Sequence, residues 1–379
     1  MDFSLSKEQS MVRATVREFA EKEVRPLAKD IDASGDFPWL TLRKMAKVGL
    51  MGMTVPKDYG GTGSDSVSYA ISIEEISRAC ASTGVIMAVH NSVCAYPIVK
   101  AGTEEQKRRY LPKLASGEML GAFALTEPGA GSDAGAVQTT AKKDGDSYVL
   151  NGTKIFITSG SEAHLLIIVA SVDRSKGSKG LAPFLVEKGT PGFTYGTIED
   201  KMGMRASATT ELVFENCRIP AGNLLGGEGD GFKIAMSSLD GGRIGIGAQA
   251  LGIAQAALDE SVKYAKEREQ FGKPIGRLQA IQWMLADMSL KVEAARCLVY
   301  RAAWLKDSGM PYGKEAAMAK LYASKIAREV ANDAVQIHGG YGYTKDYAVE
   351  RFYRDAKVTE IYEGTSEIQK LVIAGALLR

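Results

Sequence analysis

A block of short, strand-like runs between two helical regions limits the fold of this chain more than any other feature. Between residues 121 and 230, runs such as "HLLIIVASV", "LAPFLVE" and "TTELVFENC" are short and rich in β-branched, aliphatic or aromatic residues. Asp-Gly, Asn-Gly and Pro-Gly pairs separate such runs, which is typical of the turns of an antiparallel sheet. The sequence therefore predicts a middle antiparallel β domain over residues 121–230, with "HLLIIVASV" as a buried strand.

Both flanking regions carry helical patterns. Ser6 with Gln9 and Thr103 with Gln106 have the spacing of capping boxes, which mark helix starts. After the block, long segments rich in Ala, Leu, Lys and Glu run to the end of the chain. The layout predicts an α+β fold of three domains, namely an N-terminal α-helical domain over 1–120, the middle β domain over 121–230 and a C-terminal α-helical domain over 231–379.

Composition argues against several functional classes. The 47 basic and 45 acidic residues give a formal net charge of +2, so the chain has no basic surplus for nucleic acid or an anionic membrane. No apolar run approaches the length that crosses a bilayer. The N-terminal stretch "MDFSLSKEQSMVRATVREFAEKEV" carries charges throughout and lacks the apolar core of an export signal. We therefore expect a cytoplasmic protein without nucleic-acid binding or membrane insertion.

The cysteines and histidines form no ligand pattern. The four cysteines are scattered without a C-x-x-C pair, which predicts reduced core residues of a cytosolic protein. The three histidines share no metal-ligand spacing with one another or with the cysteines, so we expect no metal site. These residues are Cys80, Cys94, Cys217, Cys297, His90, His164 and His338.

Three glycine patterns need structural context before they indicate a function. "GAGSDA" (129–134) and "GIGAQA" (245–250) both fit the dinucleotide fingerprint G-x-G-x-x-A. That fingerprint requires a preceding strand and a following helix, whereas the first match precedes sheet-like sequence and the second lies within a helical pattern. A Rossmann nicotinamide site is therefore not expected. "QIHGGYGY" (336–343) is predicted to end a helix with a glycine cap.

The stretch "IYEGTSEIQ" (361–369) places a glutamate in a loop. Ser366 and Gln369 have capping-box spacing, so a helix is predicted to begin near Ser366. Glu363 precedes this helix, next to Gly364, which gives the backbone freedom for a close approach. Most glutamates are solvated, and this stretch by itself favours that ordinary interpretation.

Three segments together resemble the acyl-CoA dehydrogenase family. "ALTEPGAGSDAGA" (124–136) and "QIHGGYGYTKDYAVERFYRD" (336–355) are similar to the family's two signature stretches along their whole length, and "IYEGTSE" (361–367) is similar to the segment that carries its base. The resemblance covers essentially the entire chain, including the helix–sheet–helix layout. It implies a C-terminal four-helix bundle and the FAD-dependent α,β-dehydrogenation of an acyl-CoA to the trans-2-enoyl-CoA.

The resemblance also implies the residues that carry the reaction. Glu363 is the implied base for the α-proton, and burial beside Tyr362, the thioester and the flavin would raise its pKa. Gly242 stands where some relatives place their base, which leaves Glu363 as the sole candidate. The implied substrate-binding residues are Ser132, Asp240, Gly241, Arg243, Tyr362 and Gly364.

The implied FAD contacts come from several segments. Phe156 stands where many family members have tryptophan, so an aromatic screen over the flavin is retained. The contacts implied for the flavin ring are Phe123, Leu125, Thr126, Phe156, Ile157 and Thr158. Further implied contacts are Gly131, Ser132, Arg268, Gln270, Phe271, Gln279, Gln336, Gly339, Gly340, Thr365 and Glu367.

In the family, the contacts equivalent to 268–279 and 336–340 reach the FAD of a neighbouring subunit. The resemblance therefore implies at least a dimer, and a homotetramer built as a dimer of dimers is the family expectation. It also implies that electrons pass to an electron-transfer flavoprotein.

The acyl group is less constrained. "TGVIMAVHNS" (83–92) resembles the helix at the bottom of the family's acyl pocket, and the bulky Ile86 and Met87 predict a short, butyryl-type chain because filled space excludes extra methylenes. Short branched-chain or alicyclic acyl-CoA thioesters are alternatives. So are an oxygen-reactive acyl-CoA oxidase or flavin monooxygenase of the same fold, and a catalytically silent binding protein.

Overall fold

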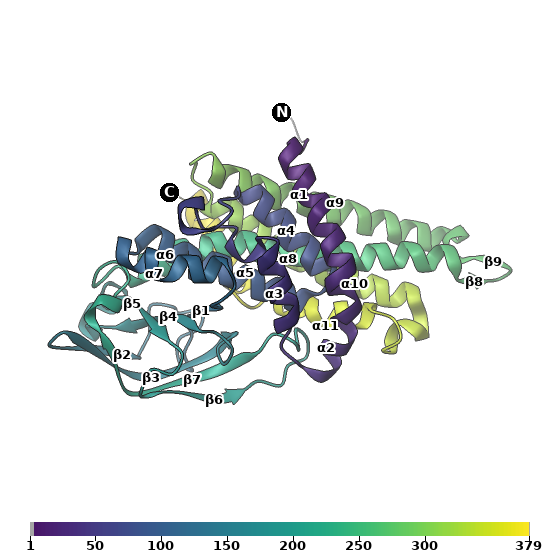
Figure 1. Ribbon diagram of the computed structural model, residues 1–379. Helices are drawn as coiled ribbons and strands as arrows, with labels where there is room; N and C mark the ends of the chain where they lie inside the picture. Colours follow the sequence, from purple (N-terminus) through teal and green to yellow (C-terminus); the bar gives the residue numbers. More distant parts are fainter. Residues whose placement is uncertain (1–3, 379) are drawn as a thin grey trace.

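The computed structural model describes residues 4–378, and Figure 1 shows a sheet on one side of a large helical body. Residues 1–3 and 379 of the predicted terminal domains lie outside this description. Both predicted capping boxes of the N-terminal region are confirmed, at Ser6 and at Thr103. The helices of this region are α1 (Lys7–Phe19), α2 (Ala28–Ser34), α3 (Trp39–Lys47), α4 (Ser66–Ala79), α5 (Ala81–Val89), the π-helical η5 (His90–Ala95), α6 (Tyr96–Ala101) and α7 (Glu104–Ala115).

Seven strands form the middle sheet, in the order β1-β4-β2-β3-β7-β6 with β5 on the free side of β4. Most pairings are antiparallel as predicted, but β1 runs parallel to β4, and the single bridge from β2 to β4 is also parallel. The turn pairs in the sequence did not predict these two pairings. The strands are β1 (Gly121–Ala124), β2 (Thr140–Asp144), β3 (Ser147–Thr158), β4 (Leu165–Ser171), β5 (Leu181–Glu187), β6 (Phe193–Ile198) and β7 (Thr209–Pro220).

The predicted turn pairs have different outcomes. Asp144-Gly145 turns the chain from β2 into β3, and Pro191-Gly192 precedes β6. Asn151-Gly152 lies inside β3, where the pairing with β7 shifts register between Leu150 and Gly152. The Asn-Gly pair therefore marks a β-bulge, and its interpretation as a turn was wrong. "HLLIIVASV" is confirmed as a buried strand, since every residue of β4 is buried.

Three long helices dominate the C-terminal region, and they extend away from the sheet to the opposite end of the molecule (Figure 1). A small hairpin of two short strands lies at their far tip, between α8 and α9. The elements are α8 (Gly231–Glu267), β8 (Glu269–Gln270), β9 (Lys273–Pro274), α9 (Gln279–Asp307), α10 (Gly313–His338), α11 (Val349–Val358) and α12 (Ser366–Leu377).

One hydrophobic core joins the N-terminal helices to the C-terminal ones, and a second core lies inside the sheet. The first depends on close helix packing around α8. A Cβ at Gly252 would lie only 2.4 Å from the backbone oxygen of Glu74 in α4. A side chain there would push α4 and α8 apart.

Two further sequence expectations concern the surface and the thiols. Cys80, Cys94 and Cys217 are buried, but Cys297 is exposed on α9, so its prediction as a core residue was wrong.

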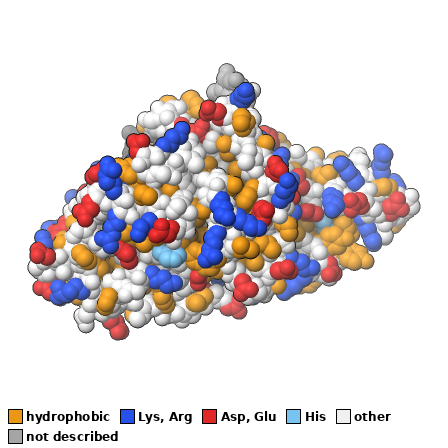
Figure 2. Space-filling view, viewed as in Figure 1, with side chains coloured by type: hydrophobic (Ala, Val, Ile, Leu, Met, Phe, Trp, Pro, Cys, Tyr) orange, Lys and Arg blue, Asp and Glu red, His pale blue; other side chains and the backbone are white. Residues whose placement is uncertain are grey.

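On the face shown in Figure 2, basic and acidic side chains are interspersed. No helix within residues 4–378 is both long and apolar enough to span a bilayer.

A buried ion pair ties β3 to the loop that follows β1. The Lys154 Nζ donates to the Glu127 Oε1 at 2.7 Å and to the backbone oxygen of Leu125 at 3.0 Å. Glu127 also accepts from the backbone N–H groups of Gln138 and Thr139. Burial lowers the pKa of the Lys154 amine to about 8, although the adjacent carboxylate opposes that shift.

Replacing Lys154 with methionine should destabilise the protein strongly, because the Glu127 carboxylate would stay buried without its cation. We expect a loss of about 3–5 kcal/mol in the free energy of unfolding, measured by chemical denaturation with FAD present. Lys143→Met, at an exposed position of β2, is the matched control and should change little. Equal losses for the two variants would contradict this account.

Candidate active site

The loop between α11 and α12 carries Glu363, the predicted base. Its backbone is left-handed at two successive residues, with φ of 52° at Glu363 and 93° at Gly364. A Cβ at Gly364 would lie 2.7 Å from the Gln369 Nε2, so glycine is required there both for conformation and for space. The following helix begins as expected, but its N-cap is Thr365, whose side chain accepts from the Ile368 N–H. The predicted capping box at Ser366 and Gln369 was therefore wrong by one residue.

The Glu363 carboxylate turns away from water. Both of its oxygens are buried and neither has a hydrogen-bond partner within residues 4–378, although the residue as a whole is partly exposed. It lies against α8, because a Cβ at Gly242 would be 2.1 Å from the Glu363 Oε2. Burial raises the pKa of Glu363 to about 7, while the positive charges of Lys320 and Arg243 limit the rise. Such a pKa suits a general base that works near neutral pH.

Tyr362 fixes the same loop from the other side. Its hydroxyl donates a short hydrogen bond to the Gln249 Oε1 on α8. The Gln249 Nε2 in turn donates to the backbone oxygen of Ala81 at 3.0 Å. Sequence reasoning missed Gln249, which lies in "GIGAQA" and was considered only as part of a false dinucleotide motif. The signal that identifies Gln249 is its complete burial, because a buried polar side chain needs hydrogen-bond partners. Only the structure shows that burial.

An apolar cluster lies beside Tyr362. On α5 and η5, Val85, Val89 and Val93 follow one another at a spacing of four residues. They pack with Ile246 of α8, and Phe123, Leu239 and Tyr362 contact the same cluster. Ile86 and Met87 belong instead to the main core. That Ile86 and Met87 close the acyl pocket therefore stays a prediction, and the valine cluster is a second candidate for the same wall.

The predicted flavin-ring residues meet at the ends of β1 and β3. The Ile155 N–H donates to the backbone oxygen of Thr126 at 2.9 Å, and the pairing of β3 with β7 shifts register between Lys154 and Ile157. In this irregular segment Phe156 has a φ of 57° and is 58% exposed. The hydrogen bond from Ile155 to Thr126 brings the C-terminal end of β1 and its continuation next to the C-terminal end of β3, and with them the predicted residues Phe123, Leu125, Thr126, Phe156, Ile157 and Thr158.

Of the predicted substrate-side residues, Asp240, Gly241 and Arg243 lie in the first third of α8, and Ser132 lies in the loop that follows β1. Asp240 pairs with the Arg243 guanidinium at 2.5 Å, while the Arg243 Nε is buried without a hydrogen-bond partner. Gly241 lies close to the Lys306 amine, 3.3 Å from where its Cβ would be. Gly131 and Ser132 lie on an exposed loop, and a Cβ at Gly131 would meet nothing within 4 Å. Glu367 is exposed in the first turn of α12.

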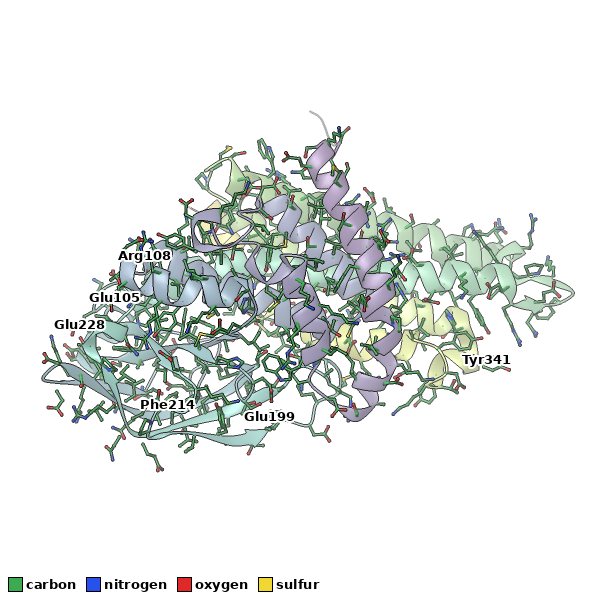
Figure 3. All side chains as sticks on the ribbon, in the orientation of Figure 1. Glu105, Arg108, Glu199, Phe214, Glu228 and Tyr341 are labelled. Carbon is green, nitrogen blue, oxygen red and sulfur yellow. The ribbon has the colours of Figure 1, made fainter. Side chains whose placement is uncertain are left out.

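The remaining predicted FAD contacts lie at the far end of the long helices. There a pocket of about 440 Å³ is lined by Arg268, Gln270, Gly339 and Gly340, together with Tyr264, His338 and Tyr341. His338 stacks on Tyr264 with ring centroids 4.2 Å apart, and the guanidinium of Arg268 lies over the ring of Tyr341, which Figure 3 labels. Phe271, Gln279 and Gln336 are exposed nearby, with Phe271 at the tip of the hairpin.

The two groups of predicted residues are far apart within one chain. Gly242 lies near the start of α8, and Arg268 caps its C-terminal end. A helix rises 1.5 Å per residue, so about 38 Å separates Gly242 from the last residue of α8, Glu267. One chain therefore presents two separate surfaces, the Glu363 site and the Arg268 pocket.

Gly242→Ala should displace the Glu363 carboxylate, because its new methyl group would overlap the Oε2 atom. We expect kcat with a short-chain acyl-CoA to fall by about 100-fold while FAD is retained. The matched control is Gly241→Ala, whose methyl group meets only the end of the flexible Lys306 side chain. The control should keep about ten times the kcat of Gly242→Ala or more. Similar losses would show that the Gly242 contact is unimportant.

Comparison with known domain families covers almost the whole chain. The acyl-CoA dehydrogenase N-terminal domain matches residues 6–118, the middle domain matches 122–217 and the C-terminal domain matches 229–378.

Curated relatives match from end to end. The short-chain specific acyl-CoA dehydrogenase of Clostridium acetobutylicum is 56% identical over 379 residues, with full coverage of both chains. The acryloyl-CoA reductase (NADH) of Anaerotignum propionicum is also 56% identical, over all of this chain and 96% of that protein.

Solved structures agree with these matches. A chain solved in work on the electron transferring flavoprotein of Acidaminococcus fermentans superposes with a TM-score of 0.99 at 53% identity. Butyryl-CoA dehydrogenase from Megasphaera elsdenii gives a TM-score of 0.98 at 49% identity. Both comparisons cover all of this chain and all of the other.

Proposed function

Because the chain belongs to the acyl-CoA dehydrogenase family of FAD-dependent enzymes, we propose that it oxidises a short-chain acyl-CoA to the trans-2-enoyl-CoA. The observation that carries the proposal is the Glu363 carboxylate, which is buried, lacks a hydrogen-bond partner and has its pKa raised to about 7 by burial. A structural glutamate would have a partner for its charge. A carboxylate left free of hydrogen bonds is available to take a proton from a bound ligand.

The chemistry needs a base for a weakly acidic C–H. The α-hydrogen of an acyl thioester is acidified by the adjacent carbonyl, and a general base of matched pKa typically contributes ~10²–10⁴-fold. Glu363 has that pKa near neutral pH. Its backbone N–H donates no hydrogen bond within residues 4–378, so it is free to stabilise charge that develops on the thioester oxygen. When bound, FAD supplies the acceptor for the β-hydride.

The neighbouring ends of β1 and β3 fit a planar ring opposite Glu363. Phe123 belongs to β1, whose continuation carries Leu125 and Thr126, and it also contacts the apolar cluster that includes Tyr362. A ligand between Tyr362 and Phe123 would therefore have the base on one side and the predicted flavin residues on the other. The exposed Phe156 ring, held by a left-handed backbone, is positioned to cover such a ring from solvent.

The valine cluster supports a short acyl chain. Val85, Val89 and Val93 are buried in the cluster that Tyr362 contacts, so their side chains would limit the length of an acyl chain there. Each methylene that cannot be buried forfeits roughly 0.8 kcal/mol of binding. The names of the relatives, short-chain specific acyl-CoA dehydrogenase and butyryl-CoA dehydrogenase, agree with this preference. A short branched-chain or alicyclic acyl group is the alternative substrate.

The Arg268 pocket fits part of an FAD that belongs to another subunit. Its Arg268 guanidinium and its glycine backbone suit a phosphate-containing group. The buried His338 Nε2 has no partner within residues 4–378 and is available to hydrogen-bond a ligand. Since this pocket lies far from Glu363 in the same chain, a shared site requires at least a dimer. We propose the homotetramer, a dimer of dimers.

The proposed electron acceptor is an electron-transfer flavoprotein, because a structural neighbour with a TM-score of 0.99 was solved in work on such a protein.

An oxygen-reactive oxidase or monooxygenase would instead form peroxide under air with butyryl-CoA. The acryloyl-CoA reductase relative favours a second direction for the same site, the reduction of a short enoyl-CoA. Assays of both directions, with peroxide measured in parallel, distinguish these functions. A purified protein without FAD would point to a silent binding protein.

Glu363→Gln should abolish most flavin reduction, because the amide cannot accept the α-proton. We expect the rate of anaerobic flavin bleaching by butyryl-CoA to fall by ~10²–10⁴-fold in stopped flow, with FAD and ligand binding kept. Glu105→Gln, on the exposed surface of α7 (Figure 3), is the control and should bleach normally. Near-normal bleaching by Glu363→Gln would refute the assignment of the base.

Val89→Ala should widen the acyl site and admit longer chains. Two further methylenes are worth roughly 1.6 kcal/mol of burial, so the hexanoyl-to-butyryl ratio of kcat/KM should rise by about 10-fold. Ile86→Val is the control, because it shortens a side chain of the same helix that packs in the main core. An equal shift for Ile86→Val, or none for Val89→Ala, would argue against this wall of the pocket.

A further inference from the structure

Two buried side chains from different helices hold the loop that carries Glu363. The Lys320 Nζ, from the first turns of α10, donates to the backbone oxygen of Gly364 at 2.8 Å. The Gln369 Nε2, from the first turn of α12, donates to the same oxygen at 2.8 Å and to the backbone oxygen of Glu363 at 3.2 Å. Lys320 and Gln369 are both fully buried.

The loop needs such support because its backbone is unusual. Glu363 is a non-glycine residue with a φ of 52°, and Gly364 follows it with a φ of 93°. A left-handed non-glycine residue is sparsely populated and persists only where its surroundings hold it. Here the carbonyl groups of both residues are held by side-chain donors. The direction in which Glu363 presents its carboxylate therefore depends on Lys320 and Gln369.

Lys320 brings a charge that its hydrogen bond does not explain. A neutral donor is enough to hold the Gly364 oxygen, as Gln369 shows. Yet Lys320 is fully buried, and it takes part in no ion pair among residues 4–378. Burial lowers the pKa of its amine to about 8, and among nearby charges Glu363 is the one that most favours its protonated form. The isolated cation and the partnerless carboxylate are each other's complement.

We propose that Lys320 is a positioning residue for the base, which holds the Glu363 loop through Gly364 and stabilises the ionised carboxylate by its charge. Gln369 holds the same loop without a charge. The inference deepens the proposed function and rests on it, because it assigns Lys320 a purpose only if Glu363 takes the α-proton.

The other charged and titratable groups around Glu363 determine in which direction its pKa should move when the Lys320 charge is removed. Arg243 of α8 also stabilises the ionised form of Glu363, but Arg243 is already paired with Asp240. Glu360 is paired with Arg328 and Lys357, and Glu367 is exposed to solvent. Burial raises the pKa of the Tyr69 and Tyr362 hydroxyls, so both are neutral near pH 7. Removing the Lys320 charge therefore raises the pKa of Glu363. Because the base works when deprotonated, the rising limb of its activity moves to higher pH.

The test isolates proton removal from the redox step. Methylthioacetyl-CoA has sulfur at the β-position and no hydride to lose, so the FAD-loaded enzyme can only exchange its α-hydrogens. Exchange in D₂O is followed by NMR between pH 5 and 9. We expect Lys320→Gln, which keeps a donor without a charge, to move the midpoint upward by about one pH unit or more. Gln369→Met should lower the maximal rate by about tenfold and leave the midpoint unchanged.

The controls separate the possible failures. Lys320→Arg keeps the charge and should keep the midpoint. Should Lys320→Gln yield no folded, FAD-loaded protein, Lys320→Met gives the same comparison without a charge. An unchanged midpoint in the charge-free variant overturns the inference, as does an equal shift in Gln369→Met. Glu363→Gln is measured in parallel, and exchange that survives in this variant overturns the proposed base itself.

Discussion

The burial of one carboxylate is the interaction on which the rest of this structure's chemistry depends. The carboxylate of Glu363 is held out of water between its own left-handed loop and α8, where the absence of a side chain at Gly242 leaves space for its oxygens. Desolvation makes the ionised form costly, which raises the pKa of Glu363 to about 7, the range that the proposed role as a base requires.

The remaining architecture can be understood as support for that position. α8 contributes Gly242 beside the carboxylate and Gln249 beneath Tyr362, while α10 and α12 contribute Lys320 and Gln369 to the loop. The sheet faces the same place with Phe123 and its neighbours, and the Lys154–Glu127 pair fixes the loop that carries them. Gly242, Gln249, Lys320, Gln369, Lys154 and Glu127 are all buried, so a change in any of them alters the packing around the site.

The length of the C-terminal helices divides the chain's functional surface in two. The Glu363 site lies near the start of α8, and the Arg268 pocket lies at its far end, too distant to serve the same ligand within one chain. In the proposed dimer, the pocket of one chain would complete the site of its neighbour. Subunit assembly and cofactor binding would then be coupled.

The sequence by itself determined the helix–sheet–helix order and the helix starts at Ser6 and Thr103, and it singled out Glu363 as the candidate base. These depend on local spacing and on motifs that are contiguous in the chain. It missed the parallel pairing of β1 with β4, the bulge at Asn151-Gly152 and the role of Gln249. It also did not single out Val85 and Val89, which belong to the apolar cluster that Tyr362 contacts. Only the tertiary structure decided these points, because which face of a buried helix meets a ligand, and which polar group is left unpaired, depends on residues distant in sequence.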